Sequence, residues 1–430
     1  MDDNPGHPTL IRGWVDEEGT AKQVEILVDP GKGTVLSIGA PAEAAVSGGP
    51  GIVEYDASFR ILPGDVNAHS HPEQSLYVDF VDPAWDLPTW CRQTIYRHSA
   101  ELSPAHIYLG CCRAFAHMLL RGVTTAVVSF YCHNRRKNDL DREVIRAARD
   151  TGIRLYFGRM HYDIVSSAAY PEKITSQESY FETGPEYEAA LLDLFAEVGE
   201  DPMVAVAPAL HSFHANSLEA IAGGIRLGAE LGRLVQFHLS EDEGDVRLCL
   251  EQHGMRPVQV LDELVSRGKV PGLSHLLASD GIWTDEAEKD LMASRGISLV
   301  LNPRMNDRVK AGRADLPAYL ERKIPLYLGT DGEASNDDLS VEGERQFLRA
   351  EFPDVGAAAI QALGRLAFSF PGCPVGLLAQ GFGADLKVVG PSGVKDVYVG
   401  GRRVLTDGRL SGIDLEKDME DPLKKLLSGW

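Results

Sequence analysis

Residues 61–71 of this chain read Ile61-Leu62-Pro63-Gly64-Asp65-Val66-Asn67-Ala68-His69-Ser70-His71, an apolar run that ends in two histidines. If the run forms a β-strand, side chains two residues apart point to the same face. The imidazoles of His69 and His71 would then lie side by side and could share one divalent metal ion. The stretch therefore predicts a strand that carries part of a metal site at its carboxyl end.

Two further ligand-type residues follow apolar stretches that also have the pattern of strands. His238 ends residues 234–238, and Asp331 follows residues 325–330. Each alone has an ordinary structural explanation, a core histidine for the first and a turn aspartate for the second. Together with the two histidines above, they form a set of imidazoles and one carboxylate. This set suits Zn²⁺ or Fe²⁺ and leaves a coordination position open for water.

The pattern of apolar stretches predicts a (β/α)8 TIM barrel. Eight stretches of strand length recur along the chain, and several are nearly continuous apolar runs, as strands buried on both faces are. Helical spacing of apolar residues predicts helices between most of them, at 139–151, 217–231 and 285–295. Alternating strands and helices of this number are typical of the barrel. The expected strands are residues 65–69, 122–130, 152–159, 203–211, 234–238, 270–275, 297–302 and 325–330.

Both ends of the chain have all-β patterns, which predict a small β-sandwich domain built from the two termini. We expect this small domain to comprise residues 1–62 and 385–414. The barrel would then occupy residues 63–384, and residues 415–430 would form a C-terminal helical tail.

Composition restricts the class of partner. The 430 residues include 42 Lys+Arg and 63 Asp+Glu, a net charge of −21, which argues against nucleic acid and against anionic membranes. No apolar run has the length of a membrane span, and the acidic start lacks the apolar core of a signal peptide. The six cysteines show no Cys-x-x-Cys pair, so free thiols in a cytoplasmic protein are expected.

Active-site residues of such barrels lie at the carboxyl ends of the strands, and many polar residues here occupy those positions. The residues at or just after the ends of expected strands are His69, His71, Tyr131, His211, His238, His275 and Asp331. His275 ends the expected sixth strand, where it could hydrogen-bond the attacking oxygen or be a core histidine. The expected fourth strand, 203–211, contains no lysine that could bridge two metals, so we predict one metal.

Glu241 follows His238 by three residues, just past the same strand end. A carboxylate at this spacing could turn back toward metal-activated water and move protons. The run Glu241-Asp242-Glu243 could equally be a solvated acidic loop or the start of a helix.

These motifs resemble the amidohydrolase superfamily, over nearly the whole chain. Residues 62–71 are similar to its first-strand signature, and His238-Leu239-Ser240-Glu241 is similar to its His-x-x-Glu motif. Residues 302–306 and 329–339 resemble the deaminase and chlorohydrolase branch. The resemblance also implies a homodimer.

Within that branch, the pattern resembles N-formimino-L-glutamate deiminase. The resemblance implies substrate contacts by Gln74, Arg92, Tyr131 and His211. The last motif, His211-Ser212-Phe213-His214, carries a histidine where that family has a carboxylate-binding arginine. A histidine is shorter and only partly charged near neutral pH, so we expect His214 to contact a less anionic substrate.

The resemblance implies hydrolysis of a C–N bond in a small amidine, formimine or aminated heterocycle, with release of ammonia. One divalent metal, with Zn²⁺ the first choice and Fe²⁺ the second, would be held by His69, His71, His238 and Asp331. Asp331 would also take the proton of water, Glu241 would protonate the substrate nitrogen, and His275 would hydrogen-bond the attacking oxygen. Two alternatives stay open: a hydrolase that releases chloride or an alkylamine or opens a cyclic amide, and a non-catalytic scaffold protein.

Overall fold

The computed structural model describes residues 8–17, 19–40, 51–166, 170–364 and 367–430. Its centre is an eight-stranded parallel barrel, in which neighbours in sequence are neighbours in space from β6 to β13. An isolated parallel bridge between Ser70 and Asp331 joins the first strand to the segment after the last. The predicted TIM barrel is confirmed. The barrel strands are β6 (Asp65–Ser70), β7 (Val123–Phe130), β8 (Arg154–His161), β9 (Val204–Leu210), β10 (Val235–Leu239), β11 (Leu276–Asp280), β12 (Ser298–Leu301) and β13 (Leu326–Leu328).

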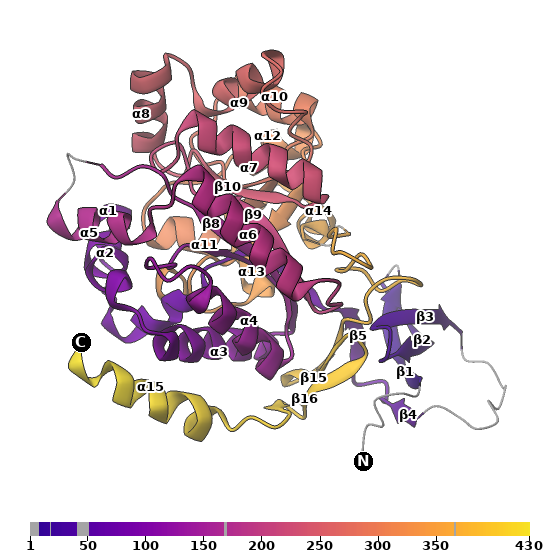
Figure 1. Ribbon diagram of the computed structural model, residues 1–430. Coiled ribbons are helices and arrows are strands. Elements are labelled where there is room, and N and C mark those ends of the chain that lie inside the picture. The colour runs from indigo at the N-terminus through magenta and orange to yellow at the C-terminus, as the bar shows by residue number, and fades with distance from the viewer. Residues whose placement is uncertain (1–7, 18, 41–50, 167–169, 365–366) are drawn as a thin grey trace.

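Helices surround this barrel, and at least one helix lies between each pair of consecutive strands (Figure 1). The strands have both faces covered, and β7, β8 and β9 are buried along their whole length. The longer helices around the barrel are α3 (Pro104–Leu120), α4 (Asp139–Thr151), α6 (Gly184–Val198), α7 (Leu218–Leu231), α9 (Pro257–Ser266), α10 (Glu286–Arg295) and α13 (Val341–Glu351). The others are η1 (Pro72–Phe80), α1 (Leu87–Gln93), α2 (Ile95–His98), η2 (Ser99–Glu101), α5 (Pro171–Tyr180), α8 (Glu243–His253), α11 (Pro303–Arg308), α12 (Leu316–Glu321), η3 (Glu333–Ser335) and α14 (Ala357–Ala362).

Two small sheets lie beside the barrel and combine both ends of the chain (Figure 1). One has the strand order β3-β2-β1-β4, and the other has the order β17-β16-β15-β14-β5. Their apolar faces share one core, to which Ile11, Ile26, Ile61 and Val388 contribute. The predicted β-sandwich is therefore confirmed. Its strands are β1 (Thr9–Glu17), β2 (Thr20–Asp29), β3 (Thr34–Gly39), β4 (Gly51–Glu54), β5 (Arg60–Pro63), β14 (Leu386–Gly390), β15 (Gly393–Val399), β16 (Arg402–Thr406) and β17 (Arg409–Leu410).

The chain after the small sheets forms a π-helical turn η4 (Leu415–Glu420), helix α15 (Asp421–Leu426) and the short η5 (Leu427–Gly429). This segment returns to the barrel and packs along α3 (Figure 1). The acidic start, residues 1–6, which we predicted to lack the apolar core of a signal peptide, lies outside the described residues. Within the described part of the chain, no helix is long and apolar enough to cross a membrane. All six cysteines are free thiols.

The sixth barrel strand differs from our prediction. We expected residues 270–275, but the strand is β11, Leu276–Asp280. Pro271 and Gly272 interrupt the first apolar run, and the run that follows pairs with β10 and β12. As a result, His275 stands at the amino end of this strand and Asp280 stands at its carboxyl end.

Candidate metal and active site

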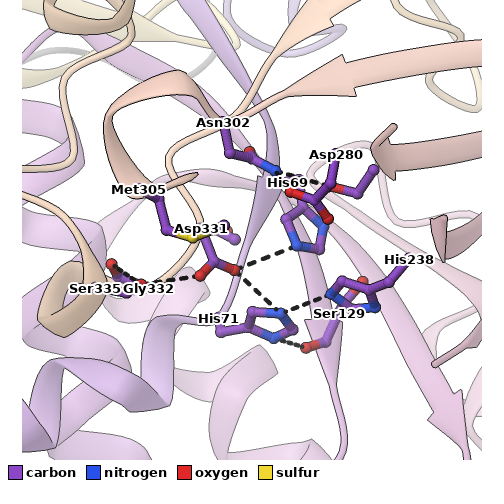
Figure 2. Close-up of polar contacts among 12 residues, drawn as sticks. His69, His71, Ser129, His238, Asp280, Asn302, Met305, Asp331, Gly332 and Ser335 are labelled. Atoms are coloured by element: carbon purple, nitrogen blue, oxygen red, sulfur yellow. Dashed lines mark hydrogen bonds and ion pairs between the residues drawn. The ribbon is translucent and has the colours of Figure 1, made fainter. Parts of the chain in front are cut away.

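Four predicted ligands meet at the carboxyl end of the barrel. His69 lies on β6 and His71 directly after it, His238 lies on β10, and Asp331 follows β13. Asp331 Oδ1 is 3.4 Å from His69 Nε2 and 3.3 Å from His71 Nε2. His71 Nε2 is 3.3 Å from His238 Nε2. Figure 2 shows the three rings and the carboxylate pointing toward a common centre.

Main-chain carbonyl groups orient two of these imidazoles. His71 Nδ1 lies 2.6 Å from the carbonyl oxygen of Ser129, and His238 Nδ1 lies 3.1 Å from that of His211. A carbonyl oxygen can only accept, so each Nδ1 carries the proton and donates it. Each Nε2 is therefore left with a lone pair that faces the common centre, which is the usual arrangement of histidine ligands.

The electrostatics of the cluster favour the protonation states that a metal requires. Burial lowers the pKa of His71 to about 4, against the attraction of Asp331, and lowers the pKa of His238 well below its ordinary value. Burial opposes ionisation of Asp331, but the neighbouring imidazoles of His69, His71 and His238 outweigh it and lower its pKa. Neutral imidazoles and an ionised carboxylate are the ligand forms of these residues.

The donor set fits a divalent metal ion. The ligand nitrogens of His69, His71 and His238 lie within 4.8 Å of one another. His69 Nε2 is buried and makes no hydrogen bond in the described structure. A buried polar atom normally has a partner, so an unpaired one aimed at three other donors is explained by a bound cation. The residues present can therefore hold the predicted metal.

A cavity of about 230 Å³ opens above the cluster. His71, His238 and Asp331 form one end of the cavity, and aromatic side chains dominate its walls. The lining residues are His71, Gln74, Leu87, Pro88, Trp90, Cys91, Ile95, Tyr96, Tyr131, Tyr162, Tyr170, Lys173, Tyr180, His211, His214, His238, Glu241, Asp242, Asp245 and Asp331. Helix α5 and the residue before it contribute Tyr170, Lys173 and Tyr180 to these walls.

Glu241 lines this cavity two residues after β10 ends. Burial raises the pKa of its carboxyl group well above the ordinary value, and the nearby carboxylates of Asp280, Asp245 and Asp331 raise it further. Glu241 therefore carries a proton under conditions in which an exposed glutamate would have lost it. A protonated carboxyl group beside a metal cluster can act as a general acid.

The sequence match to a protein family agrees with this site geometry. Residues 60–404 match the model of the amidohydrolase family. The chain belongs to the amidohydrolase family. It is therefore a hydrolase of carbon–nitrogen bonds other than peptide bonds, as the sequence predicted.

Several relatives of this amidohydrolase are named as deaminases. It is 29% identical to the 5-methylthioadenosine/S-adenosylhomocysteine deaminase of Syntrophobacter fumaroxidans, over 84% of this chain and 83% of the relative. It is 25% identical to the enzyme of the same name from Pyrococcus furiosus, over 95% of this chain and 97% of the relative. The superfamily prediction is confirmed, whereas these relatives are not named as formimino-glutamate deiminases.

Solved structures support the fold of this amidohydrolase. A zinc-bound adenosine deaminase from Xanthomonas campestris superposes with a TM-score of 0.83 at 23% identity, covering 98% of this chain and 99% of that structure. The zinc complex of atrazine chlorohydrolase from Arthrobacter aurescens gives a TM-score of 0.82 at 17% identity, covering 96% and 99%. Both neighbours were solved with zinc.

The structure places four of the five predicted substrate contacts on the cavity wall, namely Gln74, Tyr131, His211 and His214. Gln74 lies on η1 and its Nε2 is 3.5 Å from the hydroxyl of Tyr131, which follows β7. Gln74 Oε1 is buried and has no hydrogen-bond partner in the described structure. His211, after β9, lies against the His238 ring with centroids 4.8 Å apart. These polar groups are available to a ligand in the cavity.

His214 and Arg92 have other surroundings. His214 lines the cavity, but its Nδ1 lies 2.8 Å from Asp245 Oδ1, near the first turn of α8. This pairing places an acidic partner beside the histidine, which disfavours a substrate carboxylate there. Arg92 is on α1 and is not among the lining residues; its guanidinium stacks over the Tyr170 ring, 4.8 Å from the ring centroid.

The structure does not bring His275 to the site, so its predicted catalytic role is wrong. His275 precedes β11, and its Nε2 is hydrogen-bonded to the carbonyl oxygen of Ile225 on α7 at 2.8 Å. The cause is the error in the sixth strand. We placed His275 at the carboxyl end of that strand, whereas it directly precedes the amino end of β11. His275 instead ties the amino end of this strand to a surrounding helix.

Asp280 occupies the position that we had assigned to His275. It ends β11, and β11 pairs with β10 so that Ser279 is opposite His238. Burial raises the pKa of Asp280 to about 6; the charge of His69 and the amide of Asn302 oppose this effect. The sequence does contain the pattern of a strand end at Asp280, because this residue follows an apolar run and precedes a glycine. Only the correct strand boundary shows that Asp280 stands at the carboxyl end.

Proposed function

We propose that this amidohydrolase is a metal-dependent aminohydrolase, which replaces an amino group on a C=N carbon by oxygen and releases ammonia. The observation that carries the proposal is the position of Glu241. It lies in the same cavity whose end is formed by the histidine and aspartate cluster, and burial there raises the pKa of its carboxyl group. Amidine-type carbons are poor electrophiles until a neighbouring nitrogen is protonated, and Glu241 can supply that proton.

The roles of the cluster follow from its donor atoms. His69, His71, His238 and Asp331 would hold one divalent metal, for which we propose Zn²⁺, and this ion would polarise the attacking water. Glu241 protonates the ring or imine nitrogen, which draws electrons from the carbon under attack. Gln74, Tyr131 and His211 offer hydrogen bonds that orient the substrate above the cluster.

We propose an aminated heterocycle as the substrate, of the kind named in the 5-methylthioadenosine and S-adenosylhomocysteine deaminase relatives. Trp90 and five tyrosines line the cavity, and aromatic faces suit a flat ring. The pairing of His214 with Asp245 disfavours an anionic group at that wall. Both features support a planar, weakly charged ligand rather than a formimino amino acid.

Ammonia release from a defined panel tests this proposal. The protein is loaded with Zn²⁺ and incubated with adenosine, 5-methylthioadenosine, S-adenosylhomocysteine, aminopterins, aminotriazines and formimino-glutamate. We expect ammonia from at least one aminated heterocycle, and none from protein stripped of metal. Chloride and alkylamine are measured with chlorinated and alkylated triazines, because the atrazine chlorohydrolase neighbour shares the fold.

Three results would contradict the proposal. Release of chloride or alkylamine without ammonia would identify the alternative hydrolase activity. Turnover of formimino-glutamate alone would favour the deiminase substrate. A protein that binds metal but acts on no member of the panel would revive the scaffold alternative. The predicted cytoplasmic location and homodimer remain predictions from the sequence.

A further inference from the structure

Four polar side chains at the cavity form one continuous chain of hydrogen bonds. Asp245 Oδ1, in the first turn of α8, lies 2.8 Å from His214 Nδ1. His214 Nδ1 lies 2.9 Å from Ser212 Oγ, and Ser212 Oγ lies 2.8 Å from His211 Nδ1. Asp245, His214 and His211 line the cavity, and Ser212 is buried. The chain therefore connects α8 to the ring that packs against the proposed metal ligand His238.

The carboxylate of Asp245 sets the direction of the bonds in this chain. An ionised carboxylate can only accept, so His214 Nδ1 carries a proton and shares it between Asp245 and Ser212. The Ser212 hydroxyl accepts from His214 and cannot donate to it. A buried hydroxyl hydrogen normally has an acceptor, and the other partner of Ser212 Oγ in the described structure is His211 Nδ1. His211 Nδ1 is consequently an acceptor, and the proton of this ring stands on Nε2.

This tautomer gives the cavity wall a hydrogen-bond donor in a fixed position. The main chain of His211 is held, because its N–H donates to Asn216 Oδ1 at 2.9 Å and its carbonyl oxygen accepts from His238 Nδ1 at 3.1 Å. The ring packs against Tyr162 and His238, with centroid distances of 4.8 Å to both. Among the described residues, His211 Nε2 has no hydrogen-bond partner, so its proton is available to a ligand.

We propose that Asp245, His214 and Ser212 are positioning residues that hold His211 as a hydrogen-bond donor to the substrate, an inference that rests on the proposed aminohydrolase function. The part of the substrate that meets this wall is then an acceptor, such as an unprotonated ring nitrogen, rather than an N–H group. This role requires no contact between the three side chains and the substrate. It differs from that of the carboxylate-binding arginine that the resemblance implied at position 214.

Nuclear magnetic resonance of the Zn²⁺-loaded protein, labelled with ¹⁵N in histidine, tests the chain directly. Protonated and unprotonated imidazole nitrogens have well-separated ¹⁵N shifts, so the spectrum identifies the tautomer. His211→Gln assigns the signals of His211 by their loss. Ser212→Ala breaks the chain and leaves every charge in place. Ser294→Ala, which removes a serine hydroxyl that bonds to a main-chain carbonyl on α10, is the matched control.

We expect wild type and Ser294→Ala to show His211 with its proton on Nε2 alone. Ser212→Ala should show both tautomers, because Nδ1 loses the hydroxyl that donates to it. With 5-methylthioadenosine as the probe substrate, Ser212→Ala should raise KM about 2- to 10-fold and change kcat less, because the donor contributes to binding rather than to proton transfer.

Asp245→Ala should act through the same chain. Its effect on KM should match that of Ser212→Ala, and the double variant should show no more than the larger single effect. The charges of Asp245 and Asp242 both act on Glu241. Asp242→Asn therefore controls for the loss of a nearby charge, and it should leave the His211 spectrum as in wild type.

Four outcomes would contradict these expectations. A proton on Nδ1 of wild-type His211 means that the chain runs in the other direction, and an unchanged His211 spectrum in Ser212→Ala means that another contact fixes the ring. Effects of Ser212→Ala and Asp245→Ala that add in the double variant mean that the two residues act separately. Each of these three results overturns the inference. A wild-type enzyme that is inactive on the whole panel overturns the proposed function instead, and the spectra then decide the hydrogen-bond chain independently.

Discussion

At the scale of single residues, the site depends on which atom of each side chain is already bonded. The Nδ1 atoms of His71 and His238 donate to main-chain carbonyls, so only their Nε2 atoms can bind a metal. The hydroxyl of Ser335 donates a hydrogen bond to Oδ2 of Asp331 and so fixes this carboxylate as well. These fixed bonds explain how residues from distant parts of the chain present their donors to one centre without needing the cation to arrange them.

Glu241 gives the sharpest prediction at this scale. Glu241→Gln should lower ammonia release by about 10²–10⁴-fold, because glutamine has a similar shape but cannot donate a proton to the substrate nitrogen. Bound zinc should be unchanged, as measured by metal analysis of the purified variant. Turnover at the wild-type rate would exclude Glu241 as the acid.

The pH profile of the wild type should also report on Glu241. Burial and neighbouring carboxylates raise its pKa, and the acid form is the active one. The rate should therefore be retained above the ordinary glutamate pKa and fall as the pH rises through the raised value. This alkaline limb should disappear from the residual activity of Glu241→Gln. An identical limb in both enzymes would assign it to another group.

At the scale of elements, the end of β13 must approach β6 closely to bring Asp331 to the histidines. A Cβ atom at Gly329 would lie 2.4 Å from Asn302 Oδ1 and 2.9 Å from the carbonyl oxygen of His69. The main chain of His69 cannot move away without displacing a ligand. Glycine at this position therefore allows the two strands to meet.

Gly329→Ala tests this close approach. We expect a fall of about 1–3 kcal/mol in the free energy of unfolding, because the added methyl group overpacks the site. Zinc affinity should fall as well, since His69 and Asp331 move apart. Urea denaturation and zinc titration measure the two effects, and Gly223→Ala on α7 serves as a comparison, because an added Cβ there meets nothing closer than 3.9 Å. Unchanged zinc affinity would show that the strands tolerate the methyl group.

The elements also show what the sequence could and could not predict. β7 and β9 were predictable because each run is long and largely apolar, although Pro208 lies within β9. The sixth strand was not predictable, because Pro271 and Gly272 separate two apolar runs. The periodicity of apolar residues does not show which of the two runs forms the strand. The pairing of His214 with Asp245 and the stacking of Arg92 on Tyr170 depend on how α8, α1 and α5 pack. Spacing along the chain does not encode such contacts.

At the scale of the whole molecule, a buried charge cluster joins the barrel to the small domain. Asp65, at the start of β6, pairs with Lys387 on β14 and accepts two hydrogen bonds from Arg345 on α13, each of 3.1 Å. All three side chains are nearly inaccessible. The relative position of the two domains thus depends in part on one carboxylate.

Asp65→Asn should lower the free energy of unfolding by about 3–5 kcal/mol, because two buried cations lose their anionic partner. Burial alone would raise the pKa of Asp65, but Lys387 and Arg345 outweigh it and lower the pKa. The stabilisation should therefore be complete above the ordinary aspartate pKa of about 3.9 and be lost as the pH falls through the lower folded value. Urea denaturation of both proteins between neutral and acidic pH should show the difference shrinking. A constant difference would exclude this carboxylate as its source.

The barrel closes between β6 and β13 through little main-chain pairing: one isolated bridge and hydrogen bonds from Thr330 and Asp331 to the carbonyl oxygen of His69. The proposed ligands come from both sides of this junction, two histidines from one and Asp331 from the other. Asn67 and Thr330 add two hydrogen bonds across this junction, and a cation there would add a further link. Chelation should then speed amide hydrogen exchange most in β6 and β13, and least in β8 and β9 on the far side of the ring. The ion that serves catalysis would then also stabilise the closure of the barrel.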